Sequence, residues 1–222
     1  MLGIFLCLFF KDRAKVFDWM AYGWFGVLKF VNNLKFQIEG QEKMPTSKGK
    51  LIVSNHQSHL DIPAVFYASG GGVRMVAKKE LLYVPFFGFG SWLAGHIFVD
   101  RKNPESRRIT KDKIKEKLAT GQNVYLAPEG TRSKSKALGT FKKGAFFISR
   151  ALGEKLYPVI IFNGGEVLSK KDIVINCGQT IYAKVLDPID PVEHGFPDAR
   201  TYASYVRDLM QKEIEAWKSP TA

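Results

Sequence analysis

The stretch that decides both the fold and the chemistry is Ser54-Asn55-His56-Gln57-Ser58-His59-Leu60-Asp61. It follows a short apolar run at residues 51–53, which predicts a buried strand. It precedes residues 62–68, which are expected to be helical. Because proline is tolerated only in the first turn of a helix, Pro63 places the start of that helix close to it. A helix is therefore predicted to begin near Asp61, with His56 in the connection between strand and helix. Loops held by rigid elements beside a helix N-terminus are common places for chemistry.

A histidine followed five residues later by an aspartate can form a catalytic pair across such a turn. On one regular helix the same spacing separates the side chains, because helical neighbours lie three and four residues apart. A buried carboxylate bonded to one imidazole nitrogen sets the tautomer and leaves the other nitrogen free as a base. Two alternatives stay open. Asp61 caps the helix, alone or through Ser58-x-x-Asp61, and His59 is a rival base that we expect to point away from Asp61.

Three further motifs follow in order along the chain. They are Gly95-His96-Ile97-Phe98-Val99-Asp100-Arg101, Pro128-Glu129-Gly130-Thr131-Arg132-Ser133 and Tyr157-Pro158-Val159. Together with Asn55-His56-x4-Asp61 they resemble the glycerolipid acyltransferase family, most closely its bacterial 1-acylglycerol-3-phosphate acyltransferases. The resemblance covers roughly residues 36 to 190, and no motif position departs from the family pattern. The segment Phe141-Lys142-Lys143-Gly144 is also similar to the one that follows the Glu-Gly-Thr-Arg block in the family.

The resemblance implies a reaction and a set of site residues. The reaction moves a fatty acyl group from acyl-CoA or acyl carrier protein to the sn-2 hydroxyl of 1-acyl-sn-glycerol 3-phosphate, giving phosphatidic acid in phospholipid biosynthesis. The alternative is another lysophospholipid or a glycerol-phosphate acceptor. His56 is implied as the general base and Asp61 as its orienting partner. Substrate binding is implied for Arg101, Glu129, Gly130, Thr131 and Arg132.

The residue types at the substrate-binding positions suit a phosphate. Arginine offers a planar fork of donors, Gly130 lets backbone N–H groups approach an anion, and Thr131 adds a hydroxyl donor. Glu129 is expected either to orient Arg132 or to accept a hydrogen bond from a substrate hydroxyl. The alternative interpretation of this block is a turn with a local ion pair.

Three more basic residues have two interpretations each. Arg101 either binds phosphate or forms a salt bridge with Asp100 or another carboxylate. Lys78 and Lys79, which follow the strand predicted at residues 73–77, either help to bind phosphate at the carboxyl end of that strand or are solvated surface lysines.

Length and composition predict one domain, and the order of expected strands and helices predicts an α/β fold with a mixed central sheet flanked by helices. The chain has 222 residues, of which 45% are hydrophobic, enough for one sizeable core. Strands are expected at 35–39, 51–53, 73–77, 97–99, 124–127 and 156–162, with a pair at a sheet edge at 173–176 and 179–186. Helices are expected at 14–31, 103–120, 145–152 and 201–217, with short helices within 80–94 that line an apolar channel or belong to the core.

Residues 1–33 are predicted to be a membrane-interface segment ahead of a catalytic domain at 34–222. Residues 1–10 are apolar but shorter than the roughly 20 residues a bilayer span needs, and they lack the flanks of a cleaved signal peptide. The polar or small positions of the following helix trace one narrow stripe: Lys15, Asp18, Tyr22, Gly26, Lys29 and Asn33. The wide apolar remainder, rich in Trp and Phe, suits a helix lying in the membrane interface. A helix buried in the protein's own core and a single tilted span are the alternatives.

These features predict a monotopic protein of the cytoplasmic membrane with its site facing the cytoplasm. The net charge of +12 indicates acidic partners such as nucleic acid, an anionic membrane or phosphorylated substrates. Nucleic acid is disfavoured because the aromatic residues lie in apolar runs rather than among the lysines. A lipid-binding protein without activity is a further hypothesis.

Several other classes of site are not supported. Gly88-x-Gly90 lacks the third glycine of a dinucleotide fingerprint, and Gly139-x4-Gly144 lacks the Lys-Ser/Thr of a P-loop. No Gly-x-Ser-x-Gly elbow is present. We expect no metal and no cofactor other than the acyl thioester as co-substrate. The two cysteines, Cys7 and Cys177, have no ligand spacing and fit a reducing compartment.

Overall fold

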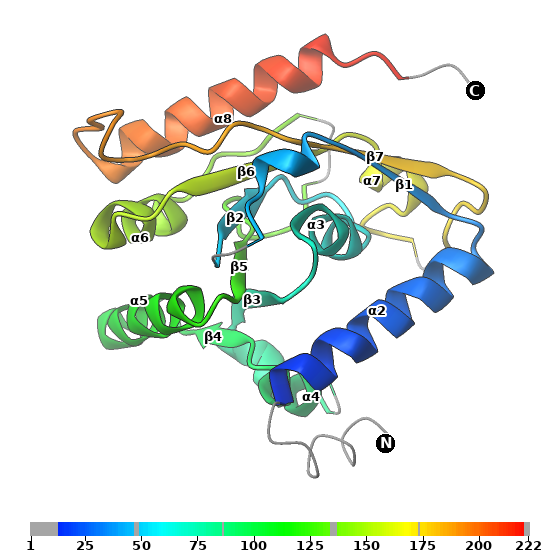
Figure 1. The fold of residues 1–222 in the computed structure, drawn as a ribbon, viewed down its shortest axis with the longest axis horizontal. Coiled ribbons are helices and arrows are strands. Elements are labelled where there is room, and N and C mark those ends of the chain that lie inside the picture. The colour runs from blue at the N-terminus through cyan, green and yellow to red at the C-terminus, as the bar shows by residue number, and fades with distance from the viewer. Residues whose placement is uncertain (1–12, 47–48, 86, 134–136, 173, 220–222) are drawn as a thin grey trace.

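The computed structural model describes residues 13–46, 49–85, 87–133, 137–172 and 174–219, and the apolar stretch at residues 1–10 lies outside them. Within these residues seven strands form one mixed sheet in the order β1-β7-β6-β2-β5-β3-β4, seen nearly edge-on in Figure 1. The strands are β1 Lys35–Glu39, β2 Leu51–Ser54, β3 Val73–Lys78, β4 Ile97–Val99, β5 Asn123–Leu126, β6 Leu156–Ile161 and β7 Thr180–Val185. All neighbours pair in parallel except β6 and β7, which are antiparallel. The predicted α/β class with a mixed central sheet is confirmed.

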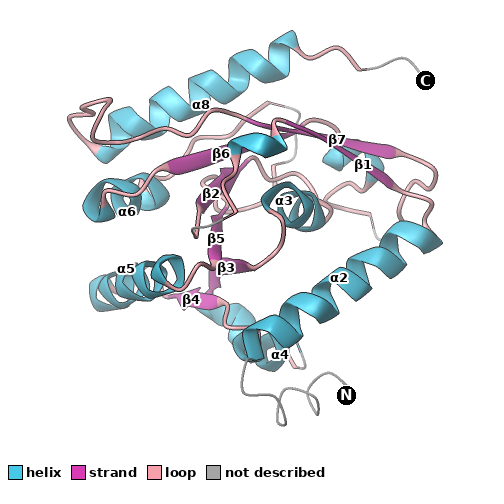
Figure 2. Cartoon of the chain, in the orientation of Figure 1, coloured by secondary structure: helices cyan, strands magenta, loops and turns pink. Residues whose placement is uncertain are grey.

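Helices cover both faces of the sheet (Figure 2). They are α2 Arg13–Val31, α3 Asp61–Ser69, α4 Phe87–Leu93, α5 Pro104–Ala119, α6 Gly144–Leu152, α7 Gly164–Val167 and α8 Ala199–Ala216, with 3₁₀ turns η1 Gln41–Lys43 and η2 Lys79–Tyr83. Successive strand residues point to opposite faces. Leu51 and Val53 of β2 accordingly pack with α5, α6 and α8, while Ile52 packs with α2 and α3.

The predicted strand pair at the sheet edge is only half right. Residues 180–185 form β7, but β7 lies between β1 and β6, and the edge strand is β1. Residues 174–176 form no strand. They are held against α7 instead, because the Asn176 amide donates to Glu166 O at 2.8 Å and Asn176 N–H donates to Val167 O at 2.9 Å.

Helix α2 forms where it was predicted, but one member of its polar stripe, Asp18, faces the protein interior, whereas Lys15, Tyr22 and Lys29 are exposed. Asp18 turns inward and pairs with Arg74 of β3, with Nη1 and Oδ1 2.6 Å apart. Phe17, Ala21 and Phe25 join the core beside α3. The predicted boundary at residue 33 therefore separates two elements of one packed unit.

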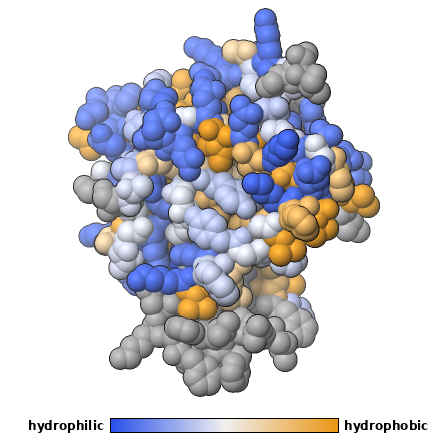
Figure 3. All heavy atoms as spheres, turned by 45° about the vertical axis from the view of Figure 1, so that its right-hand side comes forward, coloured by the Kyte–Doolittle hydropathy of each residue, from blue (hydrophilic) through white to orange (hydrophobic). Residues whose placement is uncertain are grey.

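The outer face of α2 is apolar and open to solvent. Trp19, Trp24, Val27, Phe30 and Val31 are all exposed there. Apolar side chains, orange in Figure 3, reach the surface on the side of the molecule that carries α2. Among the described helices, none combines the length and the apolar character that a membrane span requires.

Candidate active site

The candidate site lies where four parallel strands end. β2 leads to the His56 loop, β5 leads to Glu129–Arg132, and β4 leads to Arg101. Because β2, β5, β3 and β4 run side by side in the same direction, their carboxyl ends meet at one edge of the sheet. Ligands of open α/β sheets bind at that edge.

His56 and Asp61 meet as the motif predicts. His56 Nδ1 lies 2.9 Å from Asp61 Oδ2, and the Asp61 side chain is fully buried. Since an ionised carboxylate can only accept, Nδ1 carries the proton and Nε2 is left as the basic nitrogen. The His56 side chain keeps 20% of its surface exposed, so a substrate can reach it.

Asp61 is not the N-cap residue of α3, but the capping-box alternative is partly met, because Ser58 N–H donates to Asp61 Oδ2 and Ser58 Oγ accepts Leu60 N–H at 3.1 Å. Asp61 Oδ2 also accepts the backbone N–H groups of Gln57 at 2.7 Å and Ser58 at 2.8 Å, so the carboxylate points back into the loop. The N-cap of α3 is Leu60, which has no side-chain cap hydrogen bond. Both the loop and the imidazole are therefore organised by one oxygen of Asp61.

Glu129 fastens the His56 loop to its neighbours. Its carboxylate is buried and accepts the N–H of His56 at 3.0 Å through Oε1 and the N–H of Gly139 at 3.1 Å through Oε2. Ser133 N–H donates to His56 O at 2.7 Å from the same segment. Among the described residues Glu129 makes no ion pair with Arg132, and each of its oxygens accepts one backbone N–H. Its contacts instead hold the backbone of His56 in place.

Arg101 and Lys142 converge on Gly130. Gly130 has φ +75°, and a Cβ built on it would lie 2.7 Å from Arg101 Nη1 and 2.8 Å from Lys142 Nζ. Arg101 Nη1 also donates to Gly130 O at 3.3 Å. Asp100 does not pair with Arg101, because it binds Lys79 Nζ at 2.6 Å. Two cations thus flank one glycine, and Lys79 is engaged on the surface.

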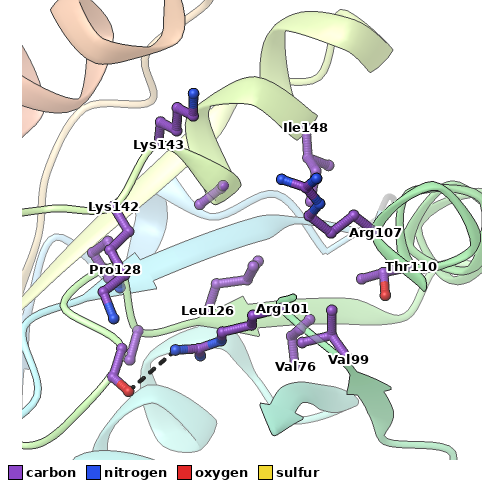
Figure 4. A pocket seen from close by; sticks show the side chains of 14 residues that line it. Val76, Val99, Arg101, Arg107, Thr110, Leu126, Pro128, Lys142, Lys143 and Ile148 are labelled. Carbon is purple, nitrogen blue, oxygen red and sulfur yellow. Dashed lines mark hydrogen bonds between the residues drawn. The ribbon is translucent and has the colours of Figure 1, made fainter. Parts of the chain in front are cut away.

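A cavity of about 340 Å³ opens beside this glycine (Figure 4). Its floor is apolar and includes Val76, Leu126 and Ile148, between α5 and α6. Arg101, Arg107, Lys142 and Lys143 line it. In the described part of the chain no carboxylate pairs with Arg107, Lys142 or Lys143. Unneutralised cations around a cavity indicate an anionic ligand.

Of the remaining predicted residues, Arg132 lies near enough to His59 for its charge to act on that imidazole. Thr131 is exposed, and Arg132 is half-buried with its carbonyl accepting Lys170 Nζ at 2.7 Å. Burial, and then the positive charges of Arg132 and His56, lower the pKa of His59. Asp61 bonds His56 and not His59, so the geometry favours His56 as the base.

Known proteins share these features. The family model described as acyltransferase matches residues 35–162. The chain belongs to the acyltransferase family. A 1-acyl-sn-glycerol-3-phosphate acyltransferase of Haemophilus influenzae is 29% identical over 86% of this chain and 79% of that protein. Human 1-acyl-sn-glycerol-3-phosphate acyltransferase alpha is 31% identical over 77% of this chain, which spans 60% of the human protein.

A solved structure shares the fold of this acyltransferase. The crystal structure of the 1-acyl-sn-glycerophosphate acyltransferase PlsC from Thermotoga maritima superposes with a TM-score of 0.79 at 24% identity, covering 100% of this chain and 89% of that one. The mixed sheet with its flanking helices is therefore the architecture of a known acyltransferase.

An apolar pocket of about 430 Å³ reaches the His56 loop of the acyltransferase from the other face of the sheet. It lies among α2, α3 and α4, and its walls include Phe25, Phe66, Met75 and Phe87. His59 and Leu60 line it where it meets the loop that carries His56. Of the short helices predicted within residues 80–94, α4 thus lines an apolar cavity through Phe87, Gly90 and Ser91, as one of the two sequence interpretations held.

Four residues of the acyltransferase site had no role in the sequence interpretation. The Asn55 amide anchors the loop to β6, donating to Ile161 O at 2.7 Å and accepting Ile161 N–H at 2.8 Å. Tyr125 lies beneath the loop and contacts Ser54 Oγ at 2.9 Å, and burial followed by the charge of Asp61 raises the pKa of Tyr125. Lys142 and Gly164 complete the set. Asn55 and Lys142 lie inside the motifs quoted from the sequence, and that position was the only indication that they belong to the site. Tyr125 and Gly164 act through contacts that no local pattern marks.

Proposed function

We propose that this enzyme transfers a fatty acyl group from an acyl thioester, acyl-CoA or acyl carrier protein, to the sn-2 hydroxyl of 1-acyl-sn-glycerol 3-phosphate, giving phosphatidic acid in phospholipid biosynthesis. The observation that carries the proposal is the 2.9 Å contact between His56 Nδ1 and buried Asp61, which leaves Nε2 as a base beside cavities for an anion and for acyl chains. The names of the relatives support the acceptor.

The catalytic pair supplies what acyl transfer to a hydroxyl needs. A hydroxyl is a weak nucleophile at neutral pH, so a base must take its proton as it attacks. His56 Nε2 takes the proton, and the oxygen forms a bond to the thioester carbonyl carbon. The tetrahedral intermediate then expels the thiolate, which receives the proton from the imidazolium. Asp61 orients the ring and stabilises its charged form. No covalent acyl-enzyme is required, because a thiolate is a good leaving group.

The two cavities suit the two ends of an amphiphilic acceptor. The side chains of Arg101 and Lys142 provide cationic donors for the phosphate beside the turn at Gly130, on the α5 and α6 side of the sheet. Arg132, whose charge acts on His59, adds a further donor, and the exposed Thr131 adds a hydroxyl. The pocket among α2, α3 and α4 is almost wholly apolar and suits acyl chains. The acceptor hydroxyl then lies between the cavities, at the His56 loop.

The proposal extends to the membrane. The exposed apolar face of α2 suits a monotopic enzyme on the cytoplasmic membrane, with the site open to the cytoplasm where both kinds of acyl thioester occur. Such an enzyme takes its acceptor from the bilayer without moving it through water.

The test is transfer of a radiolabelled acyl group by the wild type and by His56→Ala, His59→Ala and Asp61→Asn. Both donors are offered against 1-acylglycerol 3-phosphate, other lysophospholipids and glycerol 3-phosphate.

Loss of the base is expected to lower kcat about 10²–10⁴-fold in His56→Ala, and Asp61→Asn is also severely impaired because its amide favours the wrong tautomer. His59→Ala tests the rival histidine, which lines the apolar pocket and does not bond Asp61. An active His56→Ala with an inactive His59→Ala would move the base to His59. Faster transfer to another acceptor would replace the acceptor named here.

A further inference from the structure

A second apolar surface lies outside α2, on η2 and α4. Tyr83 is 75% exposed, Trp92 54%, Phe87 and Phe89 50% each, and Val84 44%. We name these five residues the aromatic face. Soluble monomers rarely leave so many large apolar side chains together in water, and such patches mark interaction sites. From the sequence, residues 80–94 are expected either to line a channel or to belong to the core. Neither role accounts for the exposed side chains of the aromatic face.

The aromatic face and α2 frame the same opening. Trp24 of α2 and Phe87 of α4 both line the apolar pocket, and both are also exposed, Trp24 at 67%. The pocket therefore reaches the surface between these two helices, which lie next to each other in Figure 1. Gly90 of α4 lines the pocket beside Phe87 and carries no side chain to narrow it.

A lipid bilayer fits this surface better than a protein partner. A protein bound to the aromatic face and to Trp24 would cover the opening of the pocket. Acyl chains of a bilayer would instead be continuous with the pocket interior. Tyr and Trp side chains suit the boundary between headgroups and acyl chains. The adjacent Lys78 is exposed without a described carboxylate partner, and it and the net charge of +12 favour anionic lipid.

We propose that the aromatic face inserts into the bilayer as a second contact beside α2, and that acyl chains enter the apolar pocket between the two. This inference rests on the proposed function for the identity of what enters, but the bilayer contact itself can be measured without any turnover.

The first experiment places Trp92 relative to the lipid. In a variant with Trp19→Phe, Trp24→Phe and Trp217→Phe, Trp92 is the remaining tryptophan. Vesicles of phosphatidylcholine and phosphatidylglycerol, brominated on their acyl chains, are expected to quench its fluorescence, and quenching should persist at high salt because the contact is apolar. If vesicles bind the protein without quenching Trp92, the proposal is overturned. Coverage of the aromatic face by residues 1–12 or by a second copy of the chain would give that result.

The second experiment removes the contact. Tyr83→Ser with Phe89→Ser takes away two exposed rings that do not line the pocket, and vesicle partitioning in flotation is expected to fall about tenfold or more. Phe147→Ser is the matched control, because Phe147 is 56% exposed on α6, on the other face of the sheet, and should leave partitioning unchanged. Equal effects of the two changes would overturn the proposal.

The readouts separate this inference from the proposed function. With the double variant, the ratio of acyl transfer on vesicles to transfer on detergent-dispersed acceptor should fall, while the ratio for Phe147→Ser should match the wild type. An unchanged ratio in the double variant counts against entry between α2 and α4. If the wild type transfers no acyl group in detergent, the proposed function fails while quenching of Trp92 still reports on the bilayer contact.

Discussion

Asp61 uses its two oxygens very differently. Oδ2 accepts from His56 Nδ1 and from the N–H groups of Gln57 and Ser58. Oδ1 is buried without a hydrogen-bond partner among the described residues, and it lies against Gly164. A Cβ on Gly164 would come within 2.6 Å of Oδ1, closer than real side chains pack. The glycine therefore makes the room that the carboxylate needs.

Gly164→Ala is expected to displace Asp61 and lower kcat about 10- to 100-fold, since a small misplacement of a catalytic group is costly. The fold should survive, as judged by circular dichroism and thermal unfolding. Gly23→Ala in α2 is the control, because a Cβ there has nothing within 4 Å. Wild-type turnover in Gly164→Ala would show that the carboxylate tolerates the shift.

The cations at Gly130 lead to a prediction about binding rather than turnover. Arg101→Gln and Lys142→Gln should each raise the acceptor KM about 10- to 100-fold, as expected for loss of a charged hydrogen bond. The donor KM should change little. Lys102→Gln, at an exposed neighbouring position, should change neither constant. A larger effect on the donor than on the acceptor would move the acceptor phosphate away from Gly130.

At the scale of elements, α2 shows which structural features a sequence pattern does not predict. The length of α2 and the positions of most strands follow from the spacing of apolar residues, because that spacing shows which segments have an apolar face to bury. The orientation of α2 does not follow. Its inner face is set by Arg74, 56 residues away in sequence, which no helical pattern contains. The same limit applies at the site, where the order of motifs predicted the His56–Asp61 contact, but the role of Glu129 as a backbone clamp needed the fold.

The pair between Asp18 and Arg74 should hold α2 on the sheet. Arg74 is fully buried, and its second nitrogen donates to Asp18 Oδ2 at 3.2 Å. Asp18→Asn should lower the free energy of unfolding by roughly 3 kcal/mol, because it leaves a buried charge without its partner. Asp18→Leu with Arg74→Met should recover much of the loss, since an apolar pair needs no compensating charge. Urea unfolding of the three proteins provides the measurement, and a stable Asp18→Asn would mean that packing alone holds the helix.

At the scale of the whole molecule, the junction of α2, β3 and α4 should make stability depend on pH. His96 lies there, with its ring edge-on to Phe17 and its Nδ1 accepting Met75 N–H at 3.2 Å. Burial, and then the charge of Arg74, lower the pKa of His96 from 6.5 to about 4. The native protein thus holds this imidazole neutral in a range where the unfolded chain protonates it.

The sign of the effect follows from proton binding. Between pH 6.5 and about 4 the unfolded state binds more protons at His96 than the native state does, so stability falls as pH falls through this range. The contribution is fully present above pH 6.5, and its loss amounts to about 3 kcal/mol near pH 4.

Carboxylates also titrate at the acid end, so the measurement is the difference between wild type and His96→Asn in urea unfolding at several pH values. Asparagine keeps an acceptor for Met75 N–H but does not titrate. The free energy of unfolding of His96→Asn should therefore decline less steeply with acid, with His96→Gln as a second variant. Parallel curves for wild type and both variants would mean that His96 is not the group that links pH to folding.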